Sequence, residues 1–188
     1  LVWGGVSYED NCQVCDDNTE NDCILVSISS TTSESATISY DSPYNIGGFQ
    51  FALSGVTLTG ATSSLAEVEL NASNGIAIGY DFGTSLAAGT GDLAVVSFVE
   101  SVSGYSLSLS DVVLSSTTGI ALVTGTVTGD DAPACANADA DTACDAVDDF
   151  PSDASETTDS DGDGVGDNGD AFPNDASETA DNDGDGTG

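Results

Sequence analysis

Residues 24–128 alternate between apolar and polar side chains with a period of two. Such alternation is typical of β-strands that bury one face. The alternating runs are Phe49 to Leu53, Ala66 to Leu70, Ile76 to Phe82 and Tyr105 to Leu109, after an opening pair at Ile24 to Ile28 and Ala36 to Tyr40. Leu93 to Val99 and Ile120 to Val123 are apolar at consecutive positions, which predicts central strands.

Turn sequences separate these runs at Gly47-Gly48, Asn74-Gly75 and Gly89 to Asp92. No segment has the 3.6-residue period of an amphipathic helix. About nine short strands at close spacing predict an all-β fold, an antiparallel β-sandwich.

The last third of the chain repeats every 22 residues, so that Phe150-Pro151 returns as Phe172-Pro173. The central copy, residues 159–170, reads DSDGDGVGDNGD. Oxygen ligands at loop positions 1, 3, 5, 7, 9 and 12, with Gly at position 6, predict a calcium loop, because Ca2+ takes roughly six to eight hard oxygen ligands in a flexible cage. Mg2+ keeps more of its waters and is less suited.

Three copies of the loop supply candidate ligands in one register. The central copy offers Asp159, Asp161, Asp163, the carbonyl of Val165, Asp167 and Asp170. The first copy offers Asn137, Asp139, Asp141, Ala143, Asp145 and Asp148, and the third offers Asp181, Asp183, Asp185 and Thr187. A solvated acidic linker is the alternative, but it would not keep this register. An EF-hand or dockerin also needs an amphipathic helix after the loop, which residues 171–180, with Pro173, cannot form.

The chain has 33 acidic residues and no Lys, Arg or His, a net charge of −33. Residues 129–188 hold 19 of these acids, so this segment repels itself unless cations neutralise it. Phosphate binding needs cations, which excludes nucleic acid and argues against anionic membranes, and no apolar run could insert into a membrane. Without His and Lys the commonest general base and the Schiff-base amine are missing, so we expect no enzyme, although paired carboxylates remain conceivable.

Five cysteines flank the alternating segment: Cys12, Cys15, Cys23, Cys135 and Cys144. Cys135 and Cys144 are near enough in sequence to close a small loop, and the odd total leaves at least one cysteine unpaired within the chain. A four-Cys zinc site is the alternative, weakly supported by one CxxC motif. Cysteines together with calcium loops predict an extracellular, oxidising location.

Four stretches resemble cohesin-type domains in their order and spacing. They are ISYDSPYNIGGFQFAL (38–53), GTGDLAVVSFVE (89–100), SLSDVVLSS (108–116) and TGTVTG (124–129). The resemblance spans residues 24–129 and implies a nine-stranded sandwich of the cohesin and carbohydrate-binding class, a jelly roll.

The central loop motif, DxDxDGxxDxxD, resembles thrombospondin type 3 repeats, as found in many secreted bacterial proteins. The first copy departs from it at Asn137 and Thr142. The opening DNCQVCDDNTENDC (10–23) resembles short Cys-rich linkers that accompany such repeats.

These features predict a Cys-rich segment at 1–23, a sandwich at 24–129 and calcium repeats at 130–188. We expect an extracellular, calcium-binding structural or adhesive protein that forms a homo-oligomer or filament, in which Leu1 to Val6 pairs with a neighbouring subunit. The alternative is a cohesin-like module that binds a dockerin-like protein or a glycan. Because the chain starts at Leu1, we expect a processed product. Asn71-Ala72-Ser73 is a glycosylation sequon.

Overall fold

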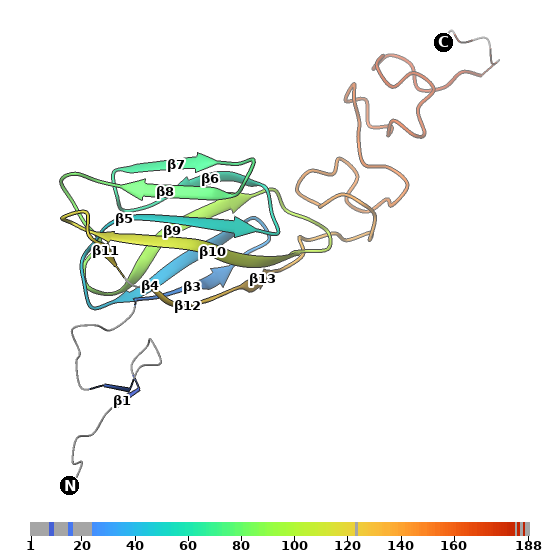
Figure 1. Cartoon of the computed structure of the whole chain (residues 1–188). Helices are drawn as coiled ribbons and strands as arrows, with labels where there is room; N and C mark the ends of the chain where they lie inside the picture. Colours follow the sequence, from blue (N-terminus) through green and yellow to red (C-terminus); the bar gives the residue numbers. More distant parts are fainter. Residues whose placement is uncertain are drawn as a thin grey trace, which may run out of the picture. The chain divides into compact units, whose positions relative to one another are not determined.

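The computed structural model describes residues 8–9, 15–16, 24–122, 124–182, 184 and 186. From residue 24 on, the described residues form two compact units. The sandwich unit holds the residues up to Val99 together with Tyr105–Pro133, and the repeat unit holds Glu100–Gly104 with Ala134 onward. The sandwich unit consists of strands, whereas the repeat unit is a series of turns (Figure 1). None of the described residues lies in a helix that could cross a membrane.

The strands are β1 (Tyr8–Glu9), β2 (Cys15–Asp16), β3 (Ile24–Thr31), β4 (Ser35–Ser42), β5 (Ile46–Ser54), β6 (Leu58–Thr62), β7 (Glu67–Asn71), β8 (Ile76–Tyr80), β9 (Gly89–Phe98), β10 (Tyr105–Ser116), β11 (Ala121–Leu122), β12 (Thr124–Thr128) and β13 (Asp130–Ala132). β1 and β2 pair with each other. The remaining strands form two sheets that pack face to face (Figure 1).

One sheet has the order β11-β10-β5-β8-β7, with β13 also paired to β10, and the other has the order β12-β3-β4-β9-β6. Neighbouring strands are antiparallel except β12, which runs parallel to β3. The exception arises where the chain crosses from β11 in one sheet to β12 in the other. The all-β, antiparallel-rich sandwich predicted from the sequence is confirmed.

The core lies between the sheets. It is built from inward side chains that alternate along each strand, as the period of two predicts. Phe51 and Leu53 of β5, Ile38 of β4, Val96 of β9 and Leu114 of β10 are almost fully buried. Removing such side chains from water stabilises the fold by about 1.5–3 kcal/mol each.

β8 presents its small residues to this core and its large ones to solvent. Ala77 is fully buried, whereas Ile78 is 37 % exposed. A Cβ added at Gly79 would overlap the ring of Phe49, so only glycine leaves room for that ring. Phe82, which continues the apolar series of the sequence, is 99 % exposed. The alternation therefore locates the strand, but its large apolar residues do not mark the buried face.

A β-bulge in β10 reverses which residues point inward. Leu107 and Leu109 are buried before it and Leu114 after it. Ser110 pairs with Ala52, but the next paired residue is Val113, opposite Gln50. Asp111, inside the bulge, has φ +50°. Aspartate tolerates this left-handed conformation better than most residues, which explains how the strand can shift phase here.

Of the two apolar runs predicted to be central strands, Leu93 to Val99 lies in β9, between β4 and β6, whereas Ile120 to Val123 is not central. Ile120 is 67 % exposed, and β11 beside it is a two-residue strand at the sheet edge. In β9, Leu93 and Val96 are buried but Val95 is 37 % exposed, because one face of its sheet meets solvent. β6 was missed by the sequence analysis, since Leu58 is its only large apolar residue.

Candidate calcium sites

Carboxylates of the repeat unit converge in two groups. The groups are Asp139, Asp141 and Asp148, and Asp159, Asp161 and Asp163, and within each group the three carboxylate oxygens lie within 4.8 Å of one another. The first group comes from loop positions 3, 5 and 12 and the second from positions 1, 3 and 5. The structure thus brings together residues that the sequence analysis assigned to single cages.

At positions 3, 5 and 12 of both loops, the two carboxylate oxygens have different roles. Oδ1 accepts a hydrogen bond from the backbone N–H two residues later, which folds the chain into a turn. The bonds are Asp141 N–H to Asp139 Oδ1 (3.3 Å), Ala143 N–H to Asp141 Oδ1 (2.7 Å), Phe150 N–H to Asp148 Oδ1 (2.8 Å), Asp163 N–H to Asp161 Oδ1 (3.2 Å), Val165 N–H to Asp163 Oδ1 (2.8 Å) and Phe172 N–H to Asp170 Oδ1 (2.7 Å).

The second oxygen of each of these carboxylates, Oδ2, is buried and has no hydrogen-bond partner. Among the described residues, the buried side-chain oxygens without a partner are those of Asp139, Asp141, Asp148, Asp161, Asp163 and Asp170. Asp148 and Asp170 are each only 8 % exposed. The same three positions in both loops therefore direct an unsatisfied anionic oxygen inward.

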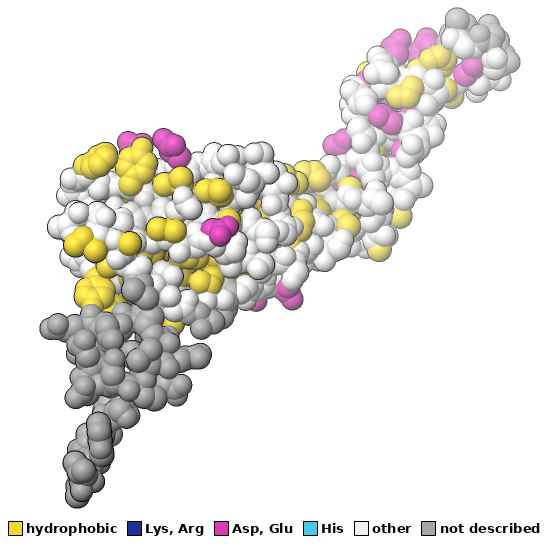
Figure 2. Space-filling view, in the orientation of Figure 1, with side chains coloured by type: hydrophobic (Ala, Val, Ile, Leu, Met, Phe, Trp, Pro, Cys, Tyr) yellow, Lys and Arg dark blue, Asp and Glu magenta, His cyan; other side chains and the backbone are white. Residues whose placement is uncertain are grey.

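Burying an ionised carboxylate without compensation is strongly unfavourable. The sequence contains no Lys, Arg or His that could compensate. Figure 2 accordingly shows acidic side chains on the repeat unit and no basic ones. A cation from solution could satisfy these oxygens, and an all-oxygen donor set suits a hard cation such as Ca2+. The residues present fit the predicted metal.

Electrostatics around Asp161 reflect the same crowding. Desolvation raises the pKa of its carboxyl, and the neighbouring carboxylates of Asp163, Asp170 and Asp159 raise it further, against a hydrogen bond from the Asp163 N–H that lowers it. Asp170, from position 12, is thus among the carboxylates whose charge acts on Asp161 at position 3. A bound cation would reverse this repulsion by favouring the charged form of each carboxylate.

Position 1 organises the start of the loop in the second and third copies. Asp159 accepts the N–H groups of Gly162 (2.7 Å) and Gly164 (2.9 Å). Asp181 makes the same two bonds with Gly184 (2.6 Å) and Gly186 (2.9 Å). All four glycines have positive φ, a conformation that glycine adopts at little cost. Asp183, Asp185 and Thr187, the other candidates of the third copy, lie outside the described residues.

The first copy reaches a related turn with different residues. Asn137 replaces Asp at position 1, where its Oδ1 accepts the Asp141 N–H (3.2 Å) and its Nδ2 donates to the Asp141 carbonyl (3.1 Å). Ala140 stands where the second copy has Gly162, and it has φ +64°. Thr142 replaces Gly164 and is not left-handed. The first loop therefore has one carboxylate fewer and a strained residue.

Position 9 closes the loop. Asp167 accepts the N–H (2.9 Å) and the hydroxyl (2.7 Å) of Ser160, and these hydrogen bonds hold its pKa below the ordinary value. Asp145 likewise accepts the Ala138 N–H (2.8 Å). Neither residue belongs to the converging carboxylate groups. The carbonyls of Ala143 and Val165 remain the candidates for position 7.

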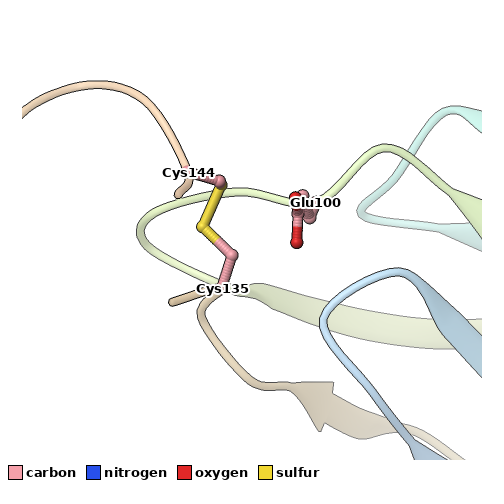
Figure 3. Close-up of side chains that lie close together, drawn as sticks. All are labelled: Glu100, Cys135 and Cys144. Atoms are coloured by element: carbon pink, nitrogen blue, oxygen red, sulfur yellow. A yellow bond between two sulfur atoms is a disulfide. The ribbon is translucent and has the colours of Figure 1, made fainter. Parts of the chain in front are cut away.

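A disulfide joins Cys135 to Cys144, with 5.8 Å between their Cα atoms. Glu100, from the segment after β9, lies close to this pair (Figure 3). The Cys135 N–H also donates to the carbonyl of Ser101 (3.0 Å). Paired sulfurs are not thiolates, so this group is no metal site while the bond is intact.

The remaining candidates are placed as follows. Asn71 is exposed at the end of β7, where its Oδ1 accepts the N–H (3.2 Å) and hydroxyl (2.7 Å) of Ser73. Cys15 is described only as part of β2. Cys12, Cys23 and the segment from Leu1 to Val6 lie outside the described residues.

Searches against protein-family models and curated proteins found no match to this chain. Among solved structures, the sandwich is similar to a non-cellulosomal cohesin from Archaeoglobus fulgidus, at 15 % identity over 61 % of this chain and 92 % of that one, with a TM-score of 0.46. A cohesin from scaffoldin B of Acetivibrio cellulolyticus, solved with a Cel5 dockerin, matches at 15 % identity over 60 % and 99 %, also with a TM-score of 0.46. A type I cohesin–dockerin complex from Clostridium thermocellum matches at 6 % identity over 62 % and 97 %, with a TM-score of 0.43.

Proposed function

We propose that the repeat unit binds Ca2+ in the loops at 137–148 and 159–170, and that the chain is an extracellular structural or adhesive protein in which calcium orders this unit. One observation carries the proposal. Six carboxylate oxygens, at the same three positions of two repeats, are buried without a partner in a chain that has no basic side chain.

The donors favour Ca2+ over smaller or softer ions. In the second loop Asp159, Asp161, Asp163 and Asp170 supply carboxylates, and the carbonyl of Val165 adds a neutral oxygen. A cage of five protein donors leaves room for water and reaches the coordination number of calcium, whereas Mg2+ prefers few protein ligands and strict octahedral geometry. The lack of sulfur or imidazole donors disfavours Zn2+ and Cu2+.

Metal takes the place of a hydrophobic core in the repeat unit. Few large apolar residues occur beyond residue 133, so burial alone cannot offset the entropy of ordering this segment. Each bound Ca2+ also neutralises two of the negative charges that repel one another there. A calcium-ordered spacer and a disulfide both suit the cell exterior, where the subunits would assemble.

Calcium titration of the purified chain tests the proposal. Isothermal calorimetry should show at least two ions bound per chain, and Asp148→Asn and Asp170→Asn should each weaken one site about 10-fold or more, since each variant removes the charge of a buried ligand oxygen. Asp111→Asn, which changes a carboxylate of the sandwich unit, is the matched control and should bind as the parent does. A parent chain without calcium binding would refute the proposal.

A second candidate is a binding module that recognises a dockerin-like protein through its sandwich. A shallow groove on the outward face of one sheet, about 210 Å3 in volume, is lined by Ile78, Tyr80 and Val113, among others. Val113 is 53 % exposed. Two of the similar cohesins were solved with dockerins. Electron microscopy and sedimentation with Ca2+ separate the candidates, because polymers favour assembly and monomers that bind a dockerin module favour the second.

A further inference from the structure

The second calcium loop is held from outside by Glu156, which lies three residues before the loop begins. Its Oε2 accepts the backbone N–H of Asn168 (3.0 Å), at position 10. The Asn168 side chain in turn donates to the carbonyl of Ser155 (2.7 Å). These bonds tie the segment before the loop to the second half of the loop, which carries Asp170.

Two glycines make room for the Glu156 carboxylate. A Cβ added at Gly166 would overlap it, and one added at Gly169 would lie 3.0 Å from its Oε1. Neither glycine has positive φ, so the backbone does not require glycine there. The space for Glu156 is therefore the physical reason for glycine at these positions.

The first loop lacks all four of these residues. In the 22-residue register, Ala134 stands for Glu156, Ala146 for Asn168, Cys144 for Gly166 and Val147 for Gly169. The backbone frame is nevertheless kept, since Asp145 N–H donates to the Ala136 carbonyl and Asp167 N–H to the Thr158 carbonyl, both at 2.9 Å. Because the first loop lacks the Glu156 contacts, another link must connect the segment before the loop to its second half. We call such a link a tie.

The disulfide provides it. Cys135 precedes the first loop by two residues, and Cys144 occupies position 8, the place of Gly166. The bond thus connects the same two parts of the repeat that Glu156 connects in the second copy. A side chain at position 8 and a glutamate before the loop would overlap, so a single loop can use only one of the two ties.

We infer that Glu156 is the positioning residue of the second calcium site, and that the Cys135–Cys144 disulfide has the same role in the first. The inference rests on the proposed calcium binding. Each tie holds position 12 against positions 3 and 5, whose carboxylates repel one another before the ion binds. Breaking a tie should therefore weaken its own site, by about 10- to 100-fold, as loss of outer-shell partners does at other metal sites.

The two sites should consequently respond to different changes. Cys135→Ser/Cys144→Ser, or reduction of the parent, should weaken the first site alone. Glu156→Ala should weaken the second site alone. Glu156→Gln keeps an acceptor for the Asn168 N–H and should stay within about threefold of the parent, given the modest net energy of one hydrogen bond. Glu178→Ala removes the corresponding charge before the third loop and is the matched control.

A rescue variant tests the equivalence directly. In Glu156→Ala/Thr157→Cys/Gly166→Cys, the new cysteines occupy the positions of Cys135 and Cys144, and the side chain that would obstruct Cys at 166 is gone. Calcium affinity of the second site should recover when this variant is oxidised and fall again on reduction. Mass spectrometry would establish that the new bond has formed.

The full-length chain should be titrated with Ca2+ by calorimetry, with each site assigned through Asp148→Asn and Asp170→Asn. A parent that binds no Ca2+ overturns the proposed function. A parent that binds two ions, while Glu156→Ala binds both as tightly as the parent, overturns only the present inference. Equal weakening of both sites by Glu156→Ala, or the same loss in Glu178→Ala, also overturns it, because the effect would then not be local.

Discussion

An aspartate that accepts the N–H two residues later does not by itself mark a metal ligand in this chain. Asp153 and Asp175 make that bond to Ser155 (3.1 Å) and Ser177 (3.2 Å) between the loops, and they also accept the serine hydroxyls. These bonds lower the pKa of both carboxyls. The six ligand candidates differ because their second oxygen is buried and unpartnered. Burial of that oxygen, rather than the local turn, distinguishes the six ligand candidates from aspartates that only accept hydrogen bonds within a turn.

Asp81 in the sandwich unit gives a residue-scale prediction that needs no metal. Its carboxylate accepts the Thr84 hydroxyl (2.5 Å) and the N–H groups of Gly83 (2.7 Å) and Ala66 (3.2 Å), and these bonds, that of Thr84 foremost, lower its pKa. Thr84→Val should raise the pKa of Asp81 toward its ordinary value, as measured by NMR titration.

The sign of the pH dependence follows from that lowered pKa. A carboxyl with a folded-state pKa below its unfolded value contributes stability above the unfolded pKa, and the contribution is lost as pH falls through the folded pKa. Thr84→Ser keeps the hydroxyl and is the control. An unchanged Asp81 pKa in Thr84→Val would show that the hydroxyl bond is not the main cause.

The candidate ligand positions and the Cys135–Cys144 pairing could be predicted from the sequence, and the structure contains that disulfide. The contact of Glu156 with the second loop could not. Regular spacing selects Asp139, Asp141 and Asp148 as candidates because the second copy repeats them as Asp161, Asp163 and Asp170. Asp167, the candidate at position 9, accepts the N–H and the hydroxyl of Ser160, a contact that the spacing did not predict. Glu156 was missed, since its contact spans 12 residues to Asn168. The sequence did hold one signal for this contact. In the first copy, Ala134 stands in the place of Glu156 and Cys144 in the place of Gly166, so the two positions change together.

At the scale of strands, the period of two reports where a strand lies more reliably than which face it buries. β8 buries Ala77 and Gly79 because the inward space is already filled by the ring of Phe49. The bulge at Asp111 changes the inward set within one strand. Both effects depend on the partner strand, β5 in each case, and a local pattern contains no information about a partner 30 or more residues away.

Gly79→Ala tests the packing of β8 on β5. The added Cβ would overlap the Phe49 ring, so the free energy of unfolding should fall by about 1–3 kcal/mol, the usual cost of overpacking. Gly60→Ala in β6 is the matched control, because its Cβ would meet Ser97 at an ordinary 3.8 Å. That variant should be neutral or stabilising by up to about 1 kcal/mol.

A second substitution makes the cause of the Gly79→Ala effect specific. Phe49→Leu removes the ring and should cost less in the Gly79→Ala background than in the parent, in urea unfolding measured by circular dichroism. Additive losses would mean that the ring and the new Cβ do not compete, contrary to the packing described here.

At the scale of the whole molecule, the two units draw stability from different sources. The sandwich unit buries a continuous apolar core, and its buried polar side chain Ser42 is hydrogen-bonded to Tyr44. The repeat unit instead buries anionic oxygens and one disulfide. The composition predicted this contrast, because large apolar residues become rare where the acidic repeats begin.

Removal of calcium should therefore unfold one unit and leave the other folded. A ligand present at 100 times its dissociation constant stabilises the bound state by about 2.7 kcal/mol per site, and chelation removes that term from the repeat unit alone. Trypsin cannot report the change, because the chain has no Lys or Arg. A glutamate-specific serine protease can, since Glu156 and Glu178 lie in the repeats and Glu67 and Glu69 in β7.

With EGTA and Mg2+ present, cleavage at Glu156 and Glu178 should accelerate strongly, whereas cleavage at Glu67 and Glu69 should not. Restored protection on adding Ca2+ but not more Mg2+ would tie the effect to calcium, and equal cleavage in both units after chelation would show that the sandwich also depends on the metal.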